Sequence, residues 1–167
     1  MHLSERVQSR FSTTCIVNKM ERPECTVCLR GTPRPYLFID LDLCGAPLGP
    51  NDVRCDFLAF VDDVKGMPCV APVEFKSRWR RKMVEQLQSG AKEAEKHVPT
   101  EFEYQFRPTG VLKSFPKAQR KKVRQHVLSF RDQFEHIRII VCGDKFIDAL
   151  QSIVLDKLRR QGNHRPE

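Results

Sequence analysis

The chain has 167 residues, of which 40% are hydrophobic and 30% are charged, a balance typical of one folded globular domain rather than a disordered segment. No apolar run approaches the roughly 20 residues that a membrane-spanning helix needs, so an integral membrane protein is not expected. The 29 Lys and Arg residues outnumber the 21 Asp and Glu residues, and the net charge of +8 favours an anionic partner, nucleic acid first.

The seven cysteines are an odd number, so they cannot all pair with one another in disulfides. The first six residues, MHLSER, lack the apolar core of a secretory signal. The sequence therefore predicts a cytoplasmic location, with reduced thiols or a metal site in place of a disulfide framework. We expect a single domain over residues 1–167, with its core at about 33–160 and an N-terminal arm or helix, including a cysteine-containing loop, at 1–32.

Three apolar segments in the first half of the chain have the composition of β-strands. Residues 36–43 are aromatic and branched, and residues 55–61 and 69–76 continue this pattern. The segment 62–68 between the last two is rich in turn-forming residues, which predicts an antiparallel connection.

The hydrophobic period then changes to helical spacing. Residues 78–98 predict a helix that Pro99 ends, because one apolar stripe runs through Trp79, Met83, Leu87, Ala91, Ala94 and Val98. Residues 102–112 alternate in places and predict a strand that is broken near Pro108. A basic connection, partly helical, follows over 113–125.

A short buried strand and a helix complete the predicted elements. Residues 137–142 (IRIIVC) predict the strand, and Asp144 is expected to cap a helix that buries Phe146, Ile147 and Leu150. This order of strands and helices predicts the α/β class, with a mixed β-sheet flanked by helices.

An acidic and a basic side chain lie two positions apart on the third predicted strand. Glu74 and Lys76 therefore point to the same face. If the hairpin is symmetric about Lys65, Asp56 and Glu74 face each other across two strands, with Cβ atoms about 5 Å apart. A second acid-x-Lys match, at residues 63–65, lies in the turn, where we expect it to be solvated.

Two opposed carboxylates on apolar strands repel each other unless a positive charge lies between them. A divalent cation resolves this repulsion, and hard oxygen ligands suit Mg²⁺. Lys76 would then hold or deprotonate a water, or stabilise charge on a phosphate. In the alternative interpretation, Asp56 starts a strand at the rim of the sheet, and Glu74 and Lys76 form an ordinary surface pair.

Asp56 followed, after 17 residues, by Glu74-Phe75-Lys76 and then by a helix resembles the PD-(D/E)xK nuclease superfamily. The resemblance implies a restriction-endonuclease-like fold whose core runs helix, three strands, helix, strand. It also implies that Asp56 and Glu74 bind Mg²⁺ or Mn²⁺, that the backbone carbonyl of Phe75 adds a ligand, and that Lys76 assists the attacking water. The segment 85–91 is similar to small nuclease-like proteins that carry a glutamine there.

The chain departs from the family pattern at several positions. Cys55 replaces the proline of the motif, and Pro72 within a strand implies a sheet edge or a bulge, which would break the symmetric pairing. The acid that the first helix of the family often supplies has three candidates here, namely Glu5, Glu21 and Glu24. The family also includes inactive members.

Other polar residues are candidates for the same site. Gln86 lies at the border of the helical stripe and either reaches the site or simply flanks the core. Asp40 and Asp42 share one face of the first predicted strand. We interpret them as acids at the end of a strand, with proximity to the metal as the alternative.

The positive charge is concentrated in segments 78–82 and 113–125, which contain no acid and together hold ten basic residues. Such a distribution predicts a surface that follows a phosphate backbone, with a merely solvated charged face as the alternative. Trp79, Phe106 and Phe115 are candidates for base stacking, although for Trp79 a place in the core is favoured. The predicted nucleic-acid-binding residues are Arg78, Arg80, Arg81, Lys82, Lys117, Arg120, Lys121, Lys122 and Arg124.

The cysteines allow a second kind of metal site. Cys25 and Cys28 form a CxxC pair, with Cys15 upstream and Cys44 downstream, and four thiolates can hold a structural Zn²⁺. A second CxxC pair is missing, so we favour reduced, half-buried cysteines over zinc. Three further cysteines lie on predicted strands and are expected in the core: Cys55, Cys69 and Cys142.

The sequence therefore predicts a Mg²⁺-dependent nuclease that hydrolyses phosphodiester bonds in DNA. One alternative is a protein of the same fold that binds nucleic acid or acts as a scaffold, with a site that is no longer catalytic. Another is a small zinc-stabilised interaction module. For a chain this small, a homodimer or a protein partner is a further way to hold a duplex.

Overall fold

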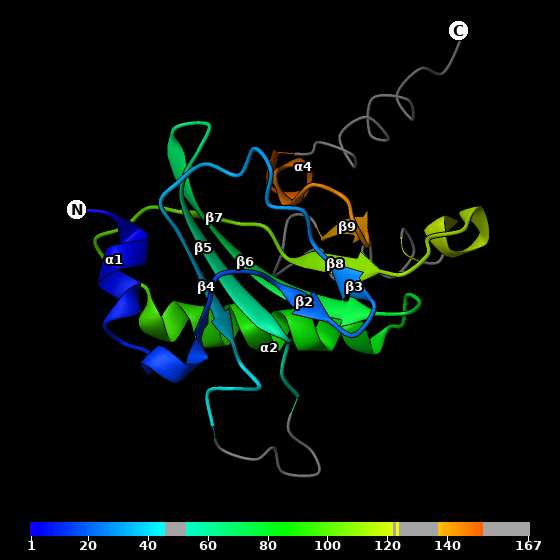
Figure 1. The fold of residues 1–167 in the computed structure, drawn as a ribbon, viewed down its shortest axis with the longest axis horizontal. Helices are drawn as coiled ribbons and strands as arrows, with labels where there is room; N and C mark the ends of the chain where they lie inside the picture. The colour runs from blue at the N-terminus through cyan, green and yellow to red at the C-terminus, as the bar shows by residue number, and fades with distance from the viewer. Residues whose placement is uncertain (46–52, 122, 124–136, 152–167) are drawn as a thin grey trace, which may run out of the picture.

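The computed structural model describes residues 1–45, 53–121, 123 and 137–151, and within these it forms a mixed α/β fold (Figure 1). The predicted α/β class with a mixed sheet flanked by helices is confirmed. The main-sheet strands are β1 (Ile16–Val17), β4 (Tyr36–Asp40), β5 (Phe57–Val64), β6 (Met67–Lys76), β7 (Gln105–Phe106), β8 (Thr109–Leu112) and β9 (Arg138–Val141). The remaining elements are α1 (Leu3–Gln8), a 3₁₀ turn (Thr13–Cys15), a separate hairpin of β2 (Glu21–Arg22) and β3 (Cys25–Thr26), α2 (Lys82–His97) and α4 (Phe146–Gln151).

The main sheet combines an antiparallel half and a parallel half. Its strand order is β1-β4-β5-β6-β8-β9, with β7 also paired to β6. Strands β4, β5 and β6 pair antiparallel, whereas β7 and β8 run parallel to β6, and β9 runs parallel to β8. Parallel neighbours need a long crossover, and α2 provides it between β6 and β8.

Both faces of the central strands are covered (Figure 1), which explains why these strands are apolar without strict alternation. One face packs against α1 and α2, and its cluster includes Leu3, Leu58 and Ala94. The other face packs against α4 and the β2–β3 hairpin, through residues such as Cys25 and Phe146. The N-terminal segment therefore covers both faces of the sheet, with α1 on one face and the β2–β3 hairpin on the other.

The β5–β6 hairpin is longer than the sequence predicted. Residues 62–68 were expected to be a turn, but β5 continues to Val64 and β6 begins at Met67. Lys65 and Gly66 alone make the turn, with φ of 56° and 87°. Two consecutive residues with positive φ are typical of the tight type I′ turn, whose twist matches the flanking strands.

Pro72 lies in a central strand, so the expected sheet edge is wrong. It pairs with Leu58, and the register is continuous from Phe57–Val73 to Val61–Cys69, with the irregularity further along, between Val61 and Val64. On the other side of β6, Pro72 falls between the residues paired with β7 and those paired with β8. A residue without an amide hydrogen fits this gap, because no partner strand is paired there.

The predicted helix is present but shorter, and it packs very closely on the sheet. It begins at Lys82 rather than at residue 78, and residues 78–81 form a connection before it. Gly90 permits the close packing: a Cβ atom added there would lie 2.3 Å from Cys55 Sγ and 2.8 Å from Pro72 Cβ. The helix therefore rests directly on the chain that leads into β5.

The strand predicted at 102–112 is broken near Pro108, as expected, into β7 and β8. The strand at 137–142 corresponds to β9. The last helix buries Phe146, Ile147 and Leu150 as predicted, and its continuation beyond Gln151 lies outside the described residues.

We predict that Gly90→Ala destabilises the protein by about 1–3 kcal/mol, because the added methyl group overpacks the helix–sheet contact. Helix propensity alone predicts that the substitution stabilises the protein, since alanine is favoured over glycine in a helix by about 1 kcal/mol. The measurement is urea-induced unfolding. Lys92→Ala, at an exposed position of the same helix, is the control and should change stability by less than about 0.5 kcal/mol. A Gly90→Ala protein more stable than the wild type would contradict the close packing.

Candidate active site

The antiparallel register brings Asp56 and Glu74 together, as the symmetric hairpin predicted. Phe57, the first residue of β5, pairs with Val73 of β6. Asp56, just before β5, therefore lies opposite Glu74 of β6. The Asp56 amide donates a hydrogen bond to Glu74 Oε2 (3.1 Å), and the Phe75 amide donates one to Asp56 Oδ2 (2.7 Å). Each carboxylate is thus held by the backbone of the other strand.

Glu74 is a buried carboxylate with a negative neighbour. Its residue is 1% exposed, and burial together with the charge of Asp56 raises the pKa of Glu74 to about 7. Lys76 opposes this rise, because its Nζ lies 2.5 Å from Glu74 Oε1. The predicted convergence of Asp56, Glu74 and Lys76 is therefore present in the fold.

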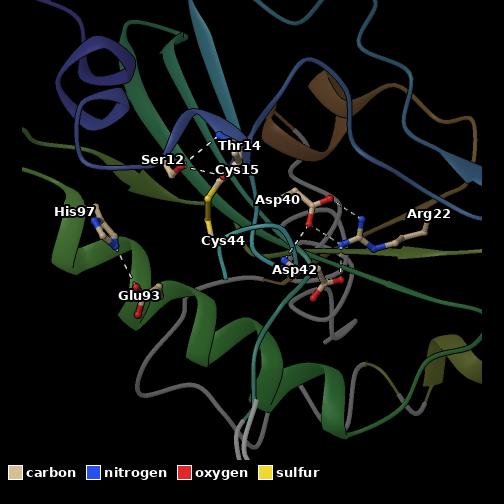
Figure 2. The surroundings of a disulfide bond; sticks show 9 residues. All are labelled: Ser12, Thr14, Cys15, Arg22, Asp40, Asp42, Cys44, Glu93 and His97. Atoms are coloured by element: carbon tan, nitrogen blue, oxygen red, sulfur yellow. Dashed lines mark hydrogen bonds and ion pairs between the residues drawn. A yellow bond between two sulfur atoms is a disulfide. The ribbon is translucent and has the colours of Figure 1, made fainter. Parts of the chain in front are cut away.

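Arg22 supplies a positive charge that sequence reasoning missed. Its guanidinium donates two hydrogen bonds to Asp40 (3.0 and 3.2 Å) and one to Asp42 (2.9 Å), as Figure 2 shows. Its Nε donates to Asp56 Oδ1 (3.1 Å), and its Cζ lies 4.2 Å from the centre of the Phe57 ring. One side chain thereby joins three carboxylates and an aromatic face.

The electrostatics of Arg22 depend on these partners. Burial alone would lower its pKa, but the hydrogen bonds and charges of Asp40 and Asp56 outweigh that effect and raise the pKa above the ordinary arginine value. Arg22 therefore remains charged beside the acids that it contacts. Asp40 and Asp42, interpreted as strand-end acids, lie at and just after the end of β4, and both contact this cation.

Gln86 approaches the chain beside the acids. Its Nε2 donates to the carbonyl of Arg54 (3.3 Å), and three residues later Ser89 Oγ donates to the carbonyl of Val53 (2.5 Å). Gln86 Oε1 is buried and has no hydrogen-bond partner in the described part of the chain. Gln86 therefore anchors the segment that leads into Asp56. Its Nε2 donates to that backbone rather than to the side chain of Asp56 or Glu74.

The three candidates for an additional N-terminal acid have other partners. Glu5 accepts a hydrogen bond from the amide of His2 (3.4 Å), and Glu21 pairs with Lys19 (2.8 Å). Glu24 pairs with Lys113 (2.8 Å). The acids that do gather near Asp56 come from β4 and the residues after it, not from the first helix.

The two basic segments meet at the end of β6 and β8. The Trp79 amide donates to Gln119 Oε1 (3.4 Å), and the Lys113 amide donates to the Lys76 carbonyl (3.2 Å). Trp79 is buried in a cluster with Met83, so its place in the core is confirmed. The predicted residues that lie exposed around this junction are Arg78, Arg80, Arg81, Lys82, Lys117, Arg120 and Lys121.

These exposed cations have no acidic partner among the described residues. Within the described ranges, no carboxylate forms an ion pair with any of the seven. Arg120 lies over the ring of Phe115, with its Cζ 5.5 Å from the ring centre. Lys122 and Arg124, also predicted for this surface, lie outside the described residues.

The cysteines differ from the prediction of reduced thiols. Cys15 pairs with Cys44 (Figure 2), and Cys25 pairs with Cys142, which leaves Cys28, Cys55 and Cys69 free. Three of the four zinc candidates, Cys15, Cys25 and Cys44, are therefore in disulfides, and Cys28 is the one that stays a free thiol. Disulfides depend on proximity in space, and Cys25 and Cys142 are 117 positions apart in the sequence, so no local pattern predicted their pairing. Cys55 and Cys69 are buried as predicted.

No family model, curated protein or solved structure matches this chain. In residues 1–45, 53–121, 123 and 137–151, no three His, Cys, Asp or Glu side chains form a group that could hold one metal ion. None of the helices over the same ranges is long and apolar enough to cross a membrane.

We predict that Glu74→Gln stabilises the protein at pH 8 by about 1–3 kcal/mol, as measured by urea-induced unfolding without metal. The pKa of Glu74, about 7 against an ordinary value of 4.5, means that the folded state binds this proton more tightly than the unfolded chain. The stabilisation from this proton is present below pH 4.5 and is lost as the pH rises through about 7. The gain of the variant should therefore shrink towards acid pH.

The exposed carboxylate of Glu103 provides the control, since Glu103→Gln should leave this pH dependence unchanged. A Glu74→Gln protein less stable than the wild type at pH 8 would contradict the unfavourable burial of this charge.

Proposed function

We propose that the protein is a metal-dependent nuclease that hydrolyses phosphodiester bonds in DNA. One observation carries the proposal: Asp56 and Glu74 are opposed across β5 and β6, with Lys76 on the same face. The element order supports it as well, since α1, the antiparallel strands β4 to β6, α2 and the parallel strand β8 follow the order of the restriction-endonuclease-like core.

The acidic pair fits a hard divalent cation. Two carboxylates on neighbouring strands offer oxygen ligands. Burial and the charge of Asp56 raise the pKa of Glu74, and a bound cation would favour its ionised form. Bound Mg²⁺ or Mn²⁺ supplies Lewis acidity and lowers the pKa of a water. Asp56 and Glu74 would hold the ion, with the backbone carbonyl of Phe75 as the further ligand that the family resemblance implies.

Lys76 lies where its ammonium group can contact a bound water or a phosphate oxygen beside the acids. It is the last residue of β6, its side chain is 35% exposed, and its ammonium remains next to the buried carboxylate. An ammonium there can donate hydrogen bonds to an attacking water or to a phosphate oxygen as charge develops. The exposed basic residues begin directly after it, so a phosphate backbone bound along them would pass Lys76.

A second candidate function follows from Arg22. Because Arg22 already contacts Asp40, Asp42 and Asp56, the acids have an internal counter-charge and do not need a metal to stay folded. This observation favours a nucleic-acid-binding protein of the same fold without catalysis, in which the basic surface remains and the acidic site is structural.

The test is cleavage of linear, circular and single-stranded DNA in Mg²⁺ or Mn²⁺, comparing the wild type with Asp56→Asn, Glu74→Gln and Lys76→Ala. We expect each substitution to lower the cleavage rate at least about 100-fold, because each removes a charge from the reacting centre. Glu103→Gln is the matched control and should cleave like the wild type. Unfolding curves verify that the variants fold.

DNA binding without cleavage in every metal, together with loss of binding at high salt, would establish the second candidate function. Cleavage that survives all three substitutions would contradict the assignment of the site.

A further inference from the structure

The β2–β3 hairpin lies outside the ladder of the main sheet, and its Arg22 reaches the acids near the start of β5. It pairs only within itself, with Glu21 opposite Thr26 and Arg22 opposite Cys25, and no described residue of the main sheet pairs with it in a ladder. In Figure 1 it lies on the side of the sheet opposite α2. Arg22 projects from this hairpin onto the carboxylates of Asp40, Asp42 and Asp56.

A disulfide fastens the same hairpin. Cys25, directly across from Arg22, is joined to Cys142 at the end of β9. The neighbouring backbone adds three hydrogen bonds: the Gly143 amide donates to the Thr26 carbonyl (2.8 Å), the Cys28 amide to the Asp144 carbonyl (3.0 Å), and the Phe146 amide to the Cys28 carbonyl (2.8 Å). At the tip, Glu24 pairs with Lys113, but both side chains are largely exposed, and such pairs contribute little. The disulfide is therefore the covalent link between this hairpin and the end of β9, beside these hydrogen bonds and the buried side chains of Met20 and Val27.

Both cysteines of this disulfide line a groove. A groove of about 700 Å³ is lined by residues 21–26 of the hairpin together with Cys142 and Gly143. Cys142 is half-buried, whereas Cys25 is buried, so we take Cys142 as the cysteine that a small thiol would reach from the groove. The second disulfide, Cys15–Cys44, joins other parts of the chain and offers an internal comparison.

We propose that Arg22 is an internal cation that competes with a divalent metal for Asp56, and that the Cys25–Cys142 disulfide holds it in place. The inference rests on the proposed function, since it presumes that Asp56 and Glu74 are the metal ligands. With the disulfide intact, the guanidinium occupies the place beside Asp56 where a metal ion would bind. With the disulfide reduced, the hairpin loses its covalent link to β9, so Arg22 leaves Asp56 more easily and the acids become available to Mg²⁺ or Mn²⁺.

The reduction is a two-electron thiol–disulfide exchange with a dithiol reductant. One thiolate of the reductant attacks Cys142 Sγ, the S–S bond breaks, and Cys25 leaves as a thiolate that takes up a proton. The second thiol of the reductant then attacks the mixed disulfide, which releases Cys142 and closes the reductant into its own disulfide. Two protein thiols form and one dithiol is oxidised.

Competition follows from charge and geometry. The Arg22 Nε hydrogen-bonds one oxygen of Asp56, and the Phe75 amide hydrogen-bonds the other. A divalent ion bound there would lie within a few ångströms of a permanent positive charge in a half-buried site, where repulsion is weakly screened. Neutralising Arg22 should therefore tighten metal binding, although it removes a residue that stabilises the acids.

The experiment is calorimetric titration of the full-length protein with Mn²⁺, without DNA. We expect Arg22→Gln to tighten Mn²⁺ binding about tenfold, and the double variant Cys25→Ser/Cys142→Ser to tighten it about threefold or more. Arg54→Gln is the matched control for Arg22, since Arg54 contacts Asp42 (3.1 Å) but not Asp56. Cys15→Ser/Cys44→Ser is the matched control for the disulfide. Both controls should change the affinity less than about twofold.

Three results would overturn part or all of the account, and they are distinguishable. If Asp56→Asn abolishes Mn²⁺ binding but Arg22→Gln does not tighten it, the competition is wrong and the metal site stands. If no variant binds Mn²⁺, the proposed metal site fails and the competition fails with it. If the two double cysteine variants behave alike, the role of the Cys25–Cys142 disulfide is wrong.

Folding is verified for each variant by thermal unfolding. Arg22→Lys provides a second variant if Arg22→Gln does not fold, because lysine keeps the charge but cannot contact three carboxylates at once. It should tighten Mn²⁺ binding by less than Arg22→Gln and by more than Arg54→Gln. An affinity equal to that of the wild type would contradict the competition.

Discussion

The opposition of two carboxylates across β5 and β6 is the constraint on which the rest of the site depends. The tight turn at Lys65 and Gly66 and the buried side chains of both strands fix the register, so Asp56 and Glu74 cannot separate by a one-residue slip. Each carboxylate accepts a hydrogen bond from a backbone amide across the pair, but such hydrogen bonds alone do not neutralise two negative charges. The surrounding structure supplies the missing positive charge.

That charge comes from two directions. Lys76 is adjacent in sequence and reaches Glu74 from the same strand, whereas Arg22 reaches Asp56 from a hairpin on another part of the chain. Arginine suits the second position because its planar fork presents several donors, and it spans Asp40, Asp42 and Asp56 at once. The pair is therefore compensated unequally: Asp56 has a permanent cation, and Glu74 still has a pKa raised to about 7.

Much of the sheet was predictable, because hydrophobic spacing and turn composition are local signals. The symmetric hairpin placed Asp56 opposite Glu74, and the helical stripe located α2, although its first turn begins later at Lys82. Arg22 was not predictable in this way. It lies in a two-residue strand without periodicity, 18 and 34 residues from Asp40 and Asp56. The only signal was indirect: two partly desolvated acids require a counter-charge, and the sequence suggested a metal before an arginine. Pro72 shows the same limit, since local rules favoured an edge and the gap between β7 and β8 accommodated it in the centre.

The most direct test of the central claim is a crystal structure with Mn²⁺, with the metal located by its anomalous scattering. The account predicts a Mn²⁺ peak between the carboxylates of Asp56 and Glu74, with the Arg22 guanidinium moved away from Asp56. A protein crystallised at saturating Mn²⁺ with Arg22 still bound to Asp56 and no anomalous peak at the pair would contradict it, and would leave the acids as a purely structural cluster.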